Sequence, residues 1–282
     1  MLKDILVIGA SGFIGRYLFQ RKYTFKSSNI YFASRDRSFG YYIDLNDNPE
    51  CWILPPHFDG AIILASITSI KQCESDSSHA YQINVKGLSN LALLLHQKNV
   101  PSLYVSSSSV FGSRIEVPYE NTPVCPNTVY GYTKAEAEKI LLARPGNCIL
   151  RASKVLGFSP LLADWKNKLQ TGLSVSAFVN MYLAPIHISF LLEWISQWVN
   201  SPIHGIYHIS STDKLSYYQF SRLLCDYLSV SPKLILPIVA GPDSTPSILN
   251  PFQCALLGCV DPMSCTIPFN KSLQLTFAEL QG

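Results

Sequence analysis

The chain has 282 residues, and its 22 basic and 19 acidic side chains leave a net charge of +3. That charge is small and no basic run accompanies it, so we expect no nucleic-acid partner. Hydrophobic residues make up 48% of the sequence, which indicates a sizeable buried core in one large or two smaller domains. No stretch approaches the roughly 20 apolar residues of a membrane span, so we expect no membrane contact. Because residues 1–4 lead directly into an apolar run, we also expect no signal peptide.

Eight cysteines are distributed along the chain without a C-x-x-C pair. Cys254, Cys259 and Cys265 follow one another at steps of five and six residues, which fit no common zinc-site spacing. We therefore predict free thiols, no metal site and a cytoplasmic protein.

The clearest motif lies at the N-terminus. The apolar residues 5–8 predict a buried strand, and glycines spaced G-x-x-G-x-x-G then open a helix predicted over 16–22. In a dinucleotide site, the first glycine permits a tight turn, the second lets a diphosphate approach the backbone, and the third lets the helix pack closely on the strand. Backbone N–H groups and the helix dipole also favour phosphate there. The expected cofactor-binding residues of this loop are Gly9, Ser11, Gly12, Phe13, Ile14 and Gly15.

A second strand, predicted over 29–33, ends in a serine, two arginines and Asp36. At this strand end an arginine accommodates the 2′-phosphate of NADP, whereas an acidic residue binds the 2′-hydroxyl of NAD. The arginines favour NADP, while Asp36 keeps NAD open, as does a solvated charged loop with no cofactor role. Asp44, in a short strand predicted over 42–45, is expected to bind the adenine amino group. The residues expected around the adenosine are Ser34, Arg35, Arg37, Asp44 and Leu45.

Further strands and helices alternate up to residue 155. This alternation predicts a parallel sheet with helices on both faces, an α/β fold of the Rossmann-type, doubly wound kind. The predicted strands are 61–66, 103–105 and 148–150, and the predicted helices are 78–97 and 129–143.

The pattern becomes irregular after residue 155. Helices are predicted over 191–199 and 217–228, with a short strand over 205–209. Residues 236–265, rich in Pro, Gly, Ser and Cys, predict a loop or lid. We expect an NAD(P)-binding domain over 1–155, with sheet strands added by later segments, and mainly a smaller, irregular substrate-binding lobe over 156–282.

Tyr130 and Lys134 are four residues apart on the helix predicted over 129–143, so they share one face. A phenol titrates near pH 10 and is a poor acid or base at neutrality. A neighbouring ammonium favours the phenolate, so we expect Lys134 to lower the pKa of Tyr130 toward neutrality. The pair therefore predicts proton transfer by the tyrosine.

Polar residues elsewhere could complete this site. A hydroxyl among the serines at 106–109 could hold a substrate carbonyl oxygen as charge develops on it, or the serines could form a polar loop. Asn84 could anchor a water that returns a proton to Tyr130, or its amide could simply be satisfied by backbone groups.

Eight short stretches carry a family resemblance. Five of them are 9–15, 64–66, 84–87, 106–112 and 130–134. Their order and spacing resemble the extended short-chain dehydrogenase/reductase family, within the NAD-dependent epimerase/dehydratase superfamily. The other three, 68–74, 149–157 and 205–210, resemble motifs of dTDP-4-dehydrorhamnose reductases and related 4-keto sugar-nucleotide reductases.

This resemblance implies NADP(H)-dependent reduction of a keto sugar nucleotide. It places the catalytic hydroxyl on Ser107, the tyrosine on Tyr130, the lysine on Lys134 and the helix asparagine on Asn84. The lysine would also bind the nicotinamide ribose. The remaining implied residues are Leu64, Ala65 and Ser66 for the cofactor and Ser108, Ser109, Tyr130 and Lys154 for the substrate.

The chain departs from the family pattern at Lys71, Lys154 and Leu156, which leaves the sugar open. An NAD-dependent epimerase or dehydratase is one alternative. A non-catalytic, NADP-binding regulatory subunit is another, because the regulatory subunit of methionine adenosyltransferase resembles the same reductases. Family analogy also suggests a homodimer through the helix over 129–143.

Overall fold

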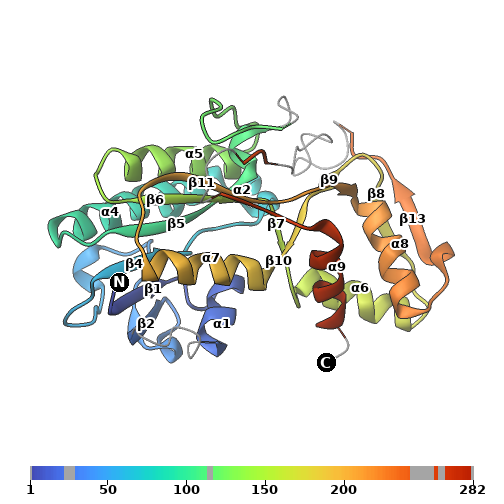
Figure 1. The fold of residues 1–282 in the computed structure, drawn as a ribbon, viewed down its shortest axis with the longest axis horizontal. Coiled ribbons are helices and arrows are strands. Elements are labelled where there is room, and N and C mark those ends of the chain that lie inside the picture. Colours follow the sequence, from blue (N-terminus) through green and yellow to red (C-terminus); the bar gives the residue numbers. More distant parts are fainter. Residues whose placement is uncertain (1, 22–28, 113–116, 242–256, 260–263, 281–282) are drawn as a thin grey trace.

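The computed structural model describes residues 2–21, 29–112, 117–241, 257–259 and 264–280. Within these ranges, eight parallel strands form one sheet in the order β14-β11-β6-β5-β4-β1-β2-β3 (Figure 1). The reversal of strand order beside β1 is the arrangement that places ligand sites at the carboxyl edge of such a sheet. The strands are β1 (Asp4–Ile8), β2 (Asn29–Ser34), β3 (Tyr41–Tyr42), β4 (Gly60–Ile63), β5 (Ser102–Ser107), β6 (Cys148–Ala152), β11 (Gly205–Ser211) and β14 (Cys265–Ile267).

Helices cover both faces of the sheet, as Figure 1 shows, so the predicted Rossmann-type doubly wound fold is confirmed. Alternate residues of β1 enter opposite cores: Ile5 and Val7 pack with α1 and α7, whereas Leu6 and Ile8 pack with α4 and α5. The helices on the two faces are α1 (Phe13–Gln20), α2 (Ile70–Ser75), α3 (Ser77–Tyr81), α4 (Leu88–Gln97), α5 (Val129–Leu142) and α7 (Ile188–Asn200).

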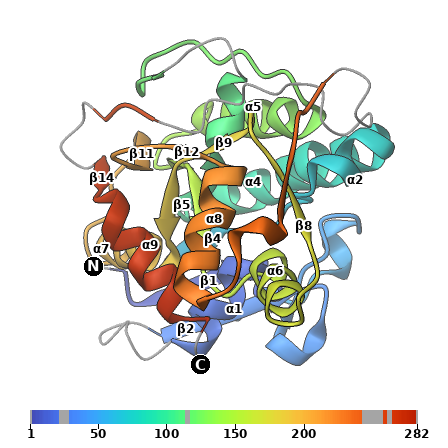
Figure 2. The same cartoon turned by 90° about the vertical axis from the view of Figure 1, so that its right-hand side faces the viewer.

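A smaller lobe packs against one end of the sheet, on the right of Figure 1 and toward the viewer in Figure 2. It has its own apolar core, in which Trp165, Phe220 and Phe277 pack together. The segments from residue 154 onward outside the large sheet and α7 are β7 (Lys154–Leu156), α6 (Pro160–Gln170), β8 (Val175–Phe178), β9 (Tyr182–Leu183), β10 (Pro185–His187), β12 (Leu215–Ser216), α8 (Tyr217–Leu228), β13 (Ile235–Ile238) and α9 (Phe269–Ala278).

The first helix begins at Phe13, before its predicted start at residue 16, and three other predicted elements in the first half of the chain differ from the structure. The strand predicted over 61–66 ends at Ile63, because the next two N–H groups both donate to the Ile8 carbonyl as the chain turns. The short strand predicted over 42–45 is only Tyr41–Tyr42, since the Asp44 carboxylate accepts from a backbone N–H two residues on and forms a turn. The helix predicted over 78–97 is interrupted by a π-turn at Gln82–Gly87.

The loop predicted over 236–265 was wrong in part. Ile235–Ile238 forms β13 against β8, and Cys265–Ile267 forms β14 at the edge of the large sheet. Residues 242–256 and 260–263 of this stretch lie outside the described ranges. Both strands are short, and each is held by a partner strand that is distant in sequence. The local sequence pattern therefore did not predict them.

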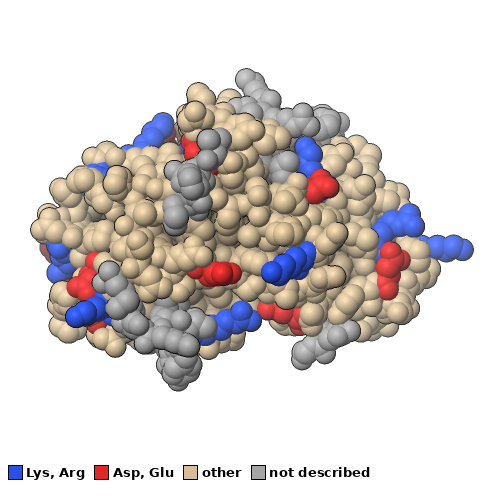
Figure 3. Space-filling model, viewed as in Figure 1, with Lys and Arg blue, Asp and Glu red and all other residues tan. Residues whose placement is uncertain are grey.

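Charged side chains of both signs lie scattered over the face of the molecule in Figure 3. Among the described residues, no helix combines the length and the apolarity needed to cross a bilayer.

Candidate active site

A cleft of about 360 Å³ opens at the carboxyl ends of β1, β4, β5 and β6. The lobe closes one side of it with Tyr182, Leu183 and Tyr217. The predicted site residues that line this cleft are Gly9, Gly12, Phe13, Ile14, Gly15, Leu64, Ser66, Ser107, Ser108, Ser109, Tyr130, Lys134 and Lys154.

The glycine loop forms one end of the cleft. Gly9 has a φ of +97°, and a Cβ there would lie 2.5 Å from the Ala65 backbone nitrogen. A Cβ on Gly15 would lie 2.3 Å from the Gly9 carbonyl oxygen, so a side chain at either position would displace backbone. Gly12 is the N-cap of α1 and carries no capping side chain, and it lines the cleft with the first turn of the helix. This arrangement fits a diphosphate held by backbone N–H groups.

The end of β2 lies beside this loop. Its last residue, Ser34, donates a hydrogen bond to the Ser11 hydroxyl over 2.7 Å. The Asp36 carboxylate accepts from the Ser38 N–H at 3.0 Å, and its hydrogen bonds with Ser38 hold the pKa of Asp36 below its usual value. Asp36 therefore caps its own turn. Arg35 follows the strand directly and is exposed.

Several predicted cofactor residues do not line the cleft. The Arg37 guanidinium lies 4.6 Å from the centroid of the Tyr42 ring, and the Asp44 carboxylate accepts the Asn46 N–H at 3.0 Å. Leu45 is buried under the helix segment that contains Gly87. The predicted residues outside the cleft lining are Ser11, Ser34, Arg35, Arg37, Asp44, Leu45, Ala65 and Asn84.

The other end of the cleft is formed where α5 begins. Thr128 caps the helix by accepting the Gly131 N–H at 3.0 Å, and the first turn holds Tyr130 in the cleft. Tyr130 and the Ser107 side chain at the end of β5 both line the cleft, and they lie close enough for Ser107 to act on the pKa of the phenol. Ser107 also contacts the Ser109 hydroxyl at 3.1 Å. The structure thus brings together the tyrosine and the serine that the sequence placed in one site.

Burial raises the pKa of Tyr130 to about 12, although the neighbouring Ser107 side chain acts in the opposite direction. The expected lowering toward neutrality is therefore wrong. Its reason is geometric: the Lys134 Nζ lies 5.9 Å from the centroid of the Tyr130 ring and donates to the Val105 carbonyl at 3.1 Å. Tyr130 is a protonated phenol at neutral pH, which suits a proton donor.

Lys134 is almost fully buried, with 3% of its surface exposed. Its Nζ lies 4.4 Å from the centroid of the Tyr104 ring. Burial lowers the pKa of Lys134 to about 7, and the charge of Glu138 partly opposes this shift. Near neutral pH the Lys134 side chain is therefore present both as the ammonium and as the neutral amine.

Asn84 lies in the π-turn and is 2% exposed. Its Oδ1 accepts the Ile67 N–H at 2.7 Å, and its Nδ2 donates to the Ile67 carbonyl at 3.0 Å and to the Thr133 hydroxyl at 3.1 Å. The amide therefore joins the loop after β4 to α5. Backbone groups satisfy most of its hydrogen-bonding capacity, which agrees with the structural role that the sequence left open. A role in returning a proton stays a prediction.

Sequence reasoning missed two groups of residues here. Glu138 and Arg151 form a buried ion pair of 2.7 Å beneath the site, and a glutamate four residues after Lys134 was the available signal. Tyr182 and Tyr217 reach the cleft from the lobe, where the sequence carried no usable pattern.

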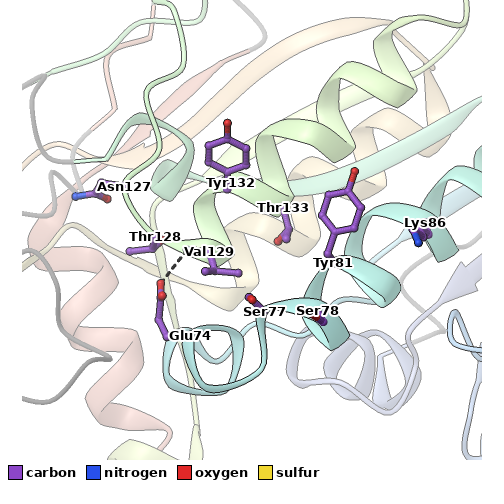
Figure 4. Close-up of a pocket in the computed structure, with 10 residues that line it drawn as sticks. All are labelled: Glu74, Ser77, Ser78, Tyr81, Lys86, Asn127, Thr128, Val129, Tyr132 and Thr133. Atoms are coloured by element: carbon purple, nitrogen blue, oxygen red, sulfur yellow. Dashed lines mark hydrogen bonds between the residues drawn. The ribbon is translucent and has the colours of Figure 1, made fainter.

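A second hollow, of about 620 Å³, lies on the outer side of α5 (Figure 4). Glu74 accepts the Val129 N–H there at 2.8 Å, which is the dashed contact in Figure 4. Tyr81 and Tyr132 project from its rim and are 44% and 59% exposed. The ionisable side chains that line this hollow are half-buried or exposed, so it lacks the buried ionisable groups that mark reactive sites.

The cysteines within the described ranges are free thiols. The Cys259 thiol donates to the Cys265 carbonyl at 3.5 Å, while Cys254 lies outside the described residues. The absence of a metal site at Cys254, Cys259 and Cys265 therefore stays a prediction.

Comparison with known proteins supports the resemblance seen in the motifs. The chain is 28% identical over 239 residues to the spore coat polysaccharide biosynthesis protein SpsK of Bacillus subtilis, covering 80% of this chain and 79% of that protein. It is 27% identical over 234 residues to a dTDP-4-dehydrorhamnose reductase of Aggregatibacter actinomycetemcomitans, covering 79% and 78%. Its fold is similar to the crystal structure of dTDP-4-dehydrorhamnose reductase from Bacillus anthracis in complex with NADP, with a TM-score of 0.84, 20% identity and coverage of 99% and 100%. Residues 3–247 match the family model of the RmlD substrate binding domain, and the chain belongs to this family.

Proposed function

We propose that this protein is an NADP(H)-dependent reductase of a 4-keto sugar nucleotide, with Tyr130 as the proton donor. The observation that carries the proposal is the meeting of Ser107, Tyr130 and Lys134 in one cleft whose other end is a glycine loop at a helix N-terminus. The relatives named as dTDP-4-dehydrorhamnose reductases support the substrate class.

The glycine loop 9–15 would hold the diphosphate, because Gly9 and Gly15 leave no room for side chains and Gly12 leaves the start of α1 open. Arg35, exposed directly after β2, would bind a 2′-phosphate. The Asp36 carboxylate is instead occupied in capping the short turn that follows it. These contacts favour NADP over NAD. The bound nicotinamide supplies the hydride for the carbonyl carbon.

The protein's own groups manage the oxygen of that carbonyl. Ser107 positions the oxygen by a hydrogen bond and stabilises the negative charge that develops on it. Tyr130 donates its phenolic proton to the same oxygen, which completes the alcohol. Because burial raises the pKa of Tyr130 to about 12, the phenol keeps its proton at neutral pH until the oxygen becomes basic enough to take it.

Lys134 would bind the nicotinamide ribose and, as an ammonium, favour the tyrosinate left after proton transfer. Ser108, Ser109 and Lys154 line the same cleft and would contact the substrate. Lys154 is exposed on β7, so its ammonium can meet an anionic part of a sugar nucleotide.

Tyr130→Phe tests the proposal directly. The variant keeps the ring and the fold, so NADPH should bind as in the wild type, while turnover of a 4-keto sugar nucleotide falls by about 10²–10⁴-fold. Fluorescence titration measures the first quantity and NADPH oxidation the second. Wild-type turnover in the variant would remove Tyr130 from this role.

The alternatives separate by simple measurements. An epimerase or dehydratase would bind NAD more tightly than NADP, and a regulatory subunit would bind the dinucleotide without oxidising it in the presence of any keto sugar nucleotide. A screen of thermal stabilisation by NADPH, NADH and nucleotide sugars distinguishes these outcomes, since a ligand raises apparent stability by mass action.

We also propose a homodimer through the outer side of α5 and a cytoplasmic location. The half-exposed Tyr81 and Tyr132 support the first, because aromatic residues are enriched at protein interfaces. The free thiols among the described cysteines support a reducing compartment. Light scattering on the wild type and on Tyr132→Arg tests the dimer, which the charged side chain should dissociate.

A further inference from the structure

Beneath the proposed site, three almost fully buried polar residues from three elements meet. Ser106 of β5 and Arg151 of β6 are register partners in the sheet, and Glu138 of α5 contacts both. The Ser106 hydroxyl donates to Glu138 Oε1 at 2.5 Å, while Arg151 Nε lies 3.1 Å from each carboxylate oxygen and Nη2 lies 2.7 Å from Oε2. Their exposed fractions are 3% for Glu138 and Arg151 and 4% for Ser106.

An ion pair this deeply buried is a weak device for stability, because desolvating two charges costs about as much as their attraction returns. Its place in the fold indicates another use. Tyr130, Lys134 and Glu138 follow one another at four-residue steps on α5, so the carboxylate lies on the helix face that carries the reactive pair.

From this placement we infer that Glu138 is a positioning residue: through Ser106 and Arg151 it fixes the carboxyl end of β5, and therefore Ser107, against the helix that carries Tyr130 and Lys134. The inference rests on the proposed function. Ser107 and Tyr130 come from different elements, so their contact depends on how β5 and α5 are held together. Ser106 precedes Ser107 directly, and its bond to Glu138 is a side-chain link between these elements at the site.

The carboxylate also supplies charge. The groups that face Lys134 are Glu138 and Tyr130 from α5, Cys73 from α2 and Tyr104 from β5. Burial raises the pKa of Cys73 to about 11 and that of Tyr104 well above its usual value, so both are neutral at pH 7. Among these groups Glu138 is therefore the anion that favours a protonated Lys134, even while Arg151 offsets part of its charge.

Two variants separate the mechanical effect from the electrostatic one. Ser106→Ala breaks the link to β5 and leaves the ion pair intact, so kcat should fall about tenfold with the pH profile of kcat/KM unchanged. Glu138→Gln keeps an oxygen that can accept from Ser106 but removes the charge, so the alkaline limb of kcat/KM should move to lower pH by about one unit. In both variants the Kd for NADPH should stay within about twofold of the wild type, since the glycine loop is untouched.

Asn147→Ala is the matched control, because Asn147 joins the same two elements at their far end. Its Oδ1 accepts the Ser102 hydroxyl at 2.8 Å and its Nδ2 donates to the Leu141 carbonyl at 2.9 Å. This variant should melt at a lower temperature yet keep the wild-type kcat and pH profile. A purely structural Glu138 would behave in the same way.

The inference is overturned if Ser106→Ala keeps its kcat within about twofold of the wild type. It is equally overturned if Glu138→Gln folds and its alkaline limb does not move. Should Glu138→Gln fail to fold, Ser106→Ala decides alone. Absence of wild-type turnover on every 4-keto sugar nucleotide would instead overturn the proposed function, and the inference with it, so the two failures are distinct.

Discussion

The two sides of α5 border two very different hollows. On the inner side, Tyr130 and Lys134 line a cleft of about 360 Å³ and Glu138 lies beneath it; Lys134 and Glu138 are each 3% exposed. On the outer side, Tyr132 is 59% exposed beside a hollow of about 620 Å³. The buried ionisable groups therefore lie on the inner side, and they, rather than the size of either hollow, identify the site on this helix.

Burial is what makes the two sides differ in chemistry. Removing the Tyr130 phenol and the Lys134 ammonium from water moves the pKa of the first up to about 12 and that of the second down to about 7. At neutral pH the phenol therefore keeps its proton, and the amine is close to its titration point.

Replacement of Lys134 by Met should separate the two sides most strongly. The methionine keeps most of the volume but removes the ammonium from the inner side, so kcat/KM for reduction should fall by about 10²–10⁴-fold. Initial rates of NADPH oxidation measure this. Lys139→Met is the control, because Lys139 lies on the same helix, is exposed and pairs with Glu136 at 2.6 Å. An equal loss in both variants would contradict the assignment of chemistry to the inner side.

The same Lys134→Met variant should alter how stability depends on pH. The folded pKa of Lys134, about 7, lies below its unfolded value, so between pH 7 and about 10 the unfolded chain binds the extra proton. Wild-type stability should therefore rise with pH in this window by up to about 1 kcal/mol per unit more than that of the variant. Urea denaturation of both proteins at pH 7, 8 and 9 gives the difference. Parallel curves would mean that Lys134 keeps its ordinary pKa in the fold.

The inner side also shows which features a sequence can predict. The strand 5–8, its glycines and the four-residue step from Tyr130 to Lys134 are local patterns, so each was identifiable without the fold. Their meeting at one sheet edge followed from the general rule for parallel sheets, and the Ser107 to Tyr130 contact agrees with it.

What could not be predicted depends on contacts distant in sequence. The pKa of Tyr130 was expected to fall, but its direction is set by burial and by a lysine that donates to a backbone carbonyl. Tyr182 and Tyr217 reach the cleft only because the lobe folds over it. The spacing on the helix identified Glu138 as a neighbour of Lys134. Its partner Arg151 lies on β6, 13 residues away in sequence, so no local pattern joined the two.

Gly131→Ala should weaken the inner contact without touching any reactive group. A Cβ at this position would lie 2.4 Å from the Ser109 carbonyl oxygen, so α5 and the turn after β5 must move apart. We expect a loss of about 1–3 kcal/mol in unfolding free energy, together with lower kcat. Gly241→Ala is the control, because within the described ranges no atom outside its chain neighbours lies within 4 Å of a Cβ built there, and its stability should change by less than about 0.5 kcal/mol. Equal melting temperatures for both variants would show that the helix can shift at no cost.

Tyr132→Ser should have the smallest effect of these changes on catalysis. Tyr132 follows Tyr130 by two residues, but on a helix that spacing turns its side chain to the outer side, where it is mostly exposed. Its removal forfeits little buried surface in the single chain, so kcat/KM should stay within about twofold and the pH profile should not move. Steady-state kinetics at several pH values measure both. If the variant instead lost turnover in proportion to the dissociation of the proposed dimer, the outer side would support the inner side through a second copy of the chain. Light scattering on the same samples distinguishes that outcome from a direct role of Tyr132 in catalysis.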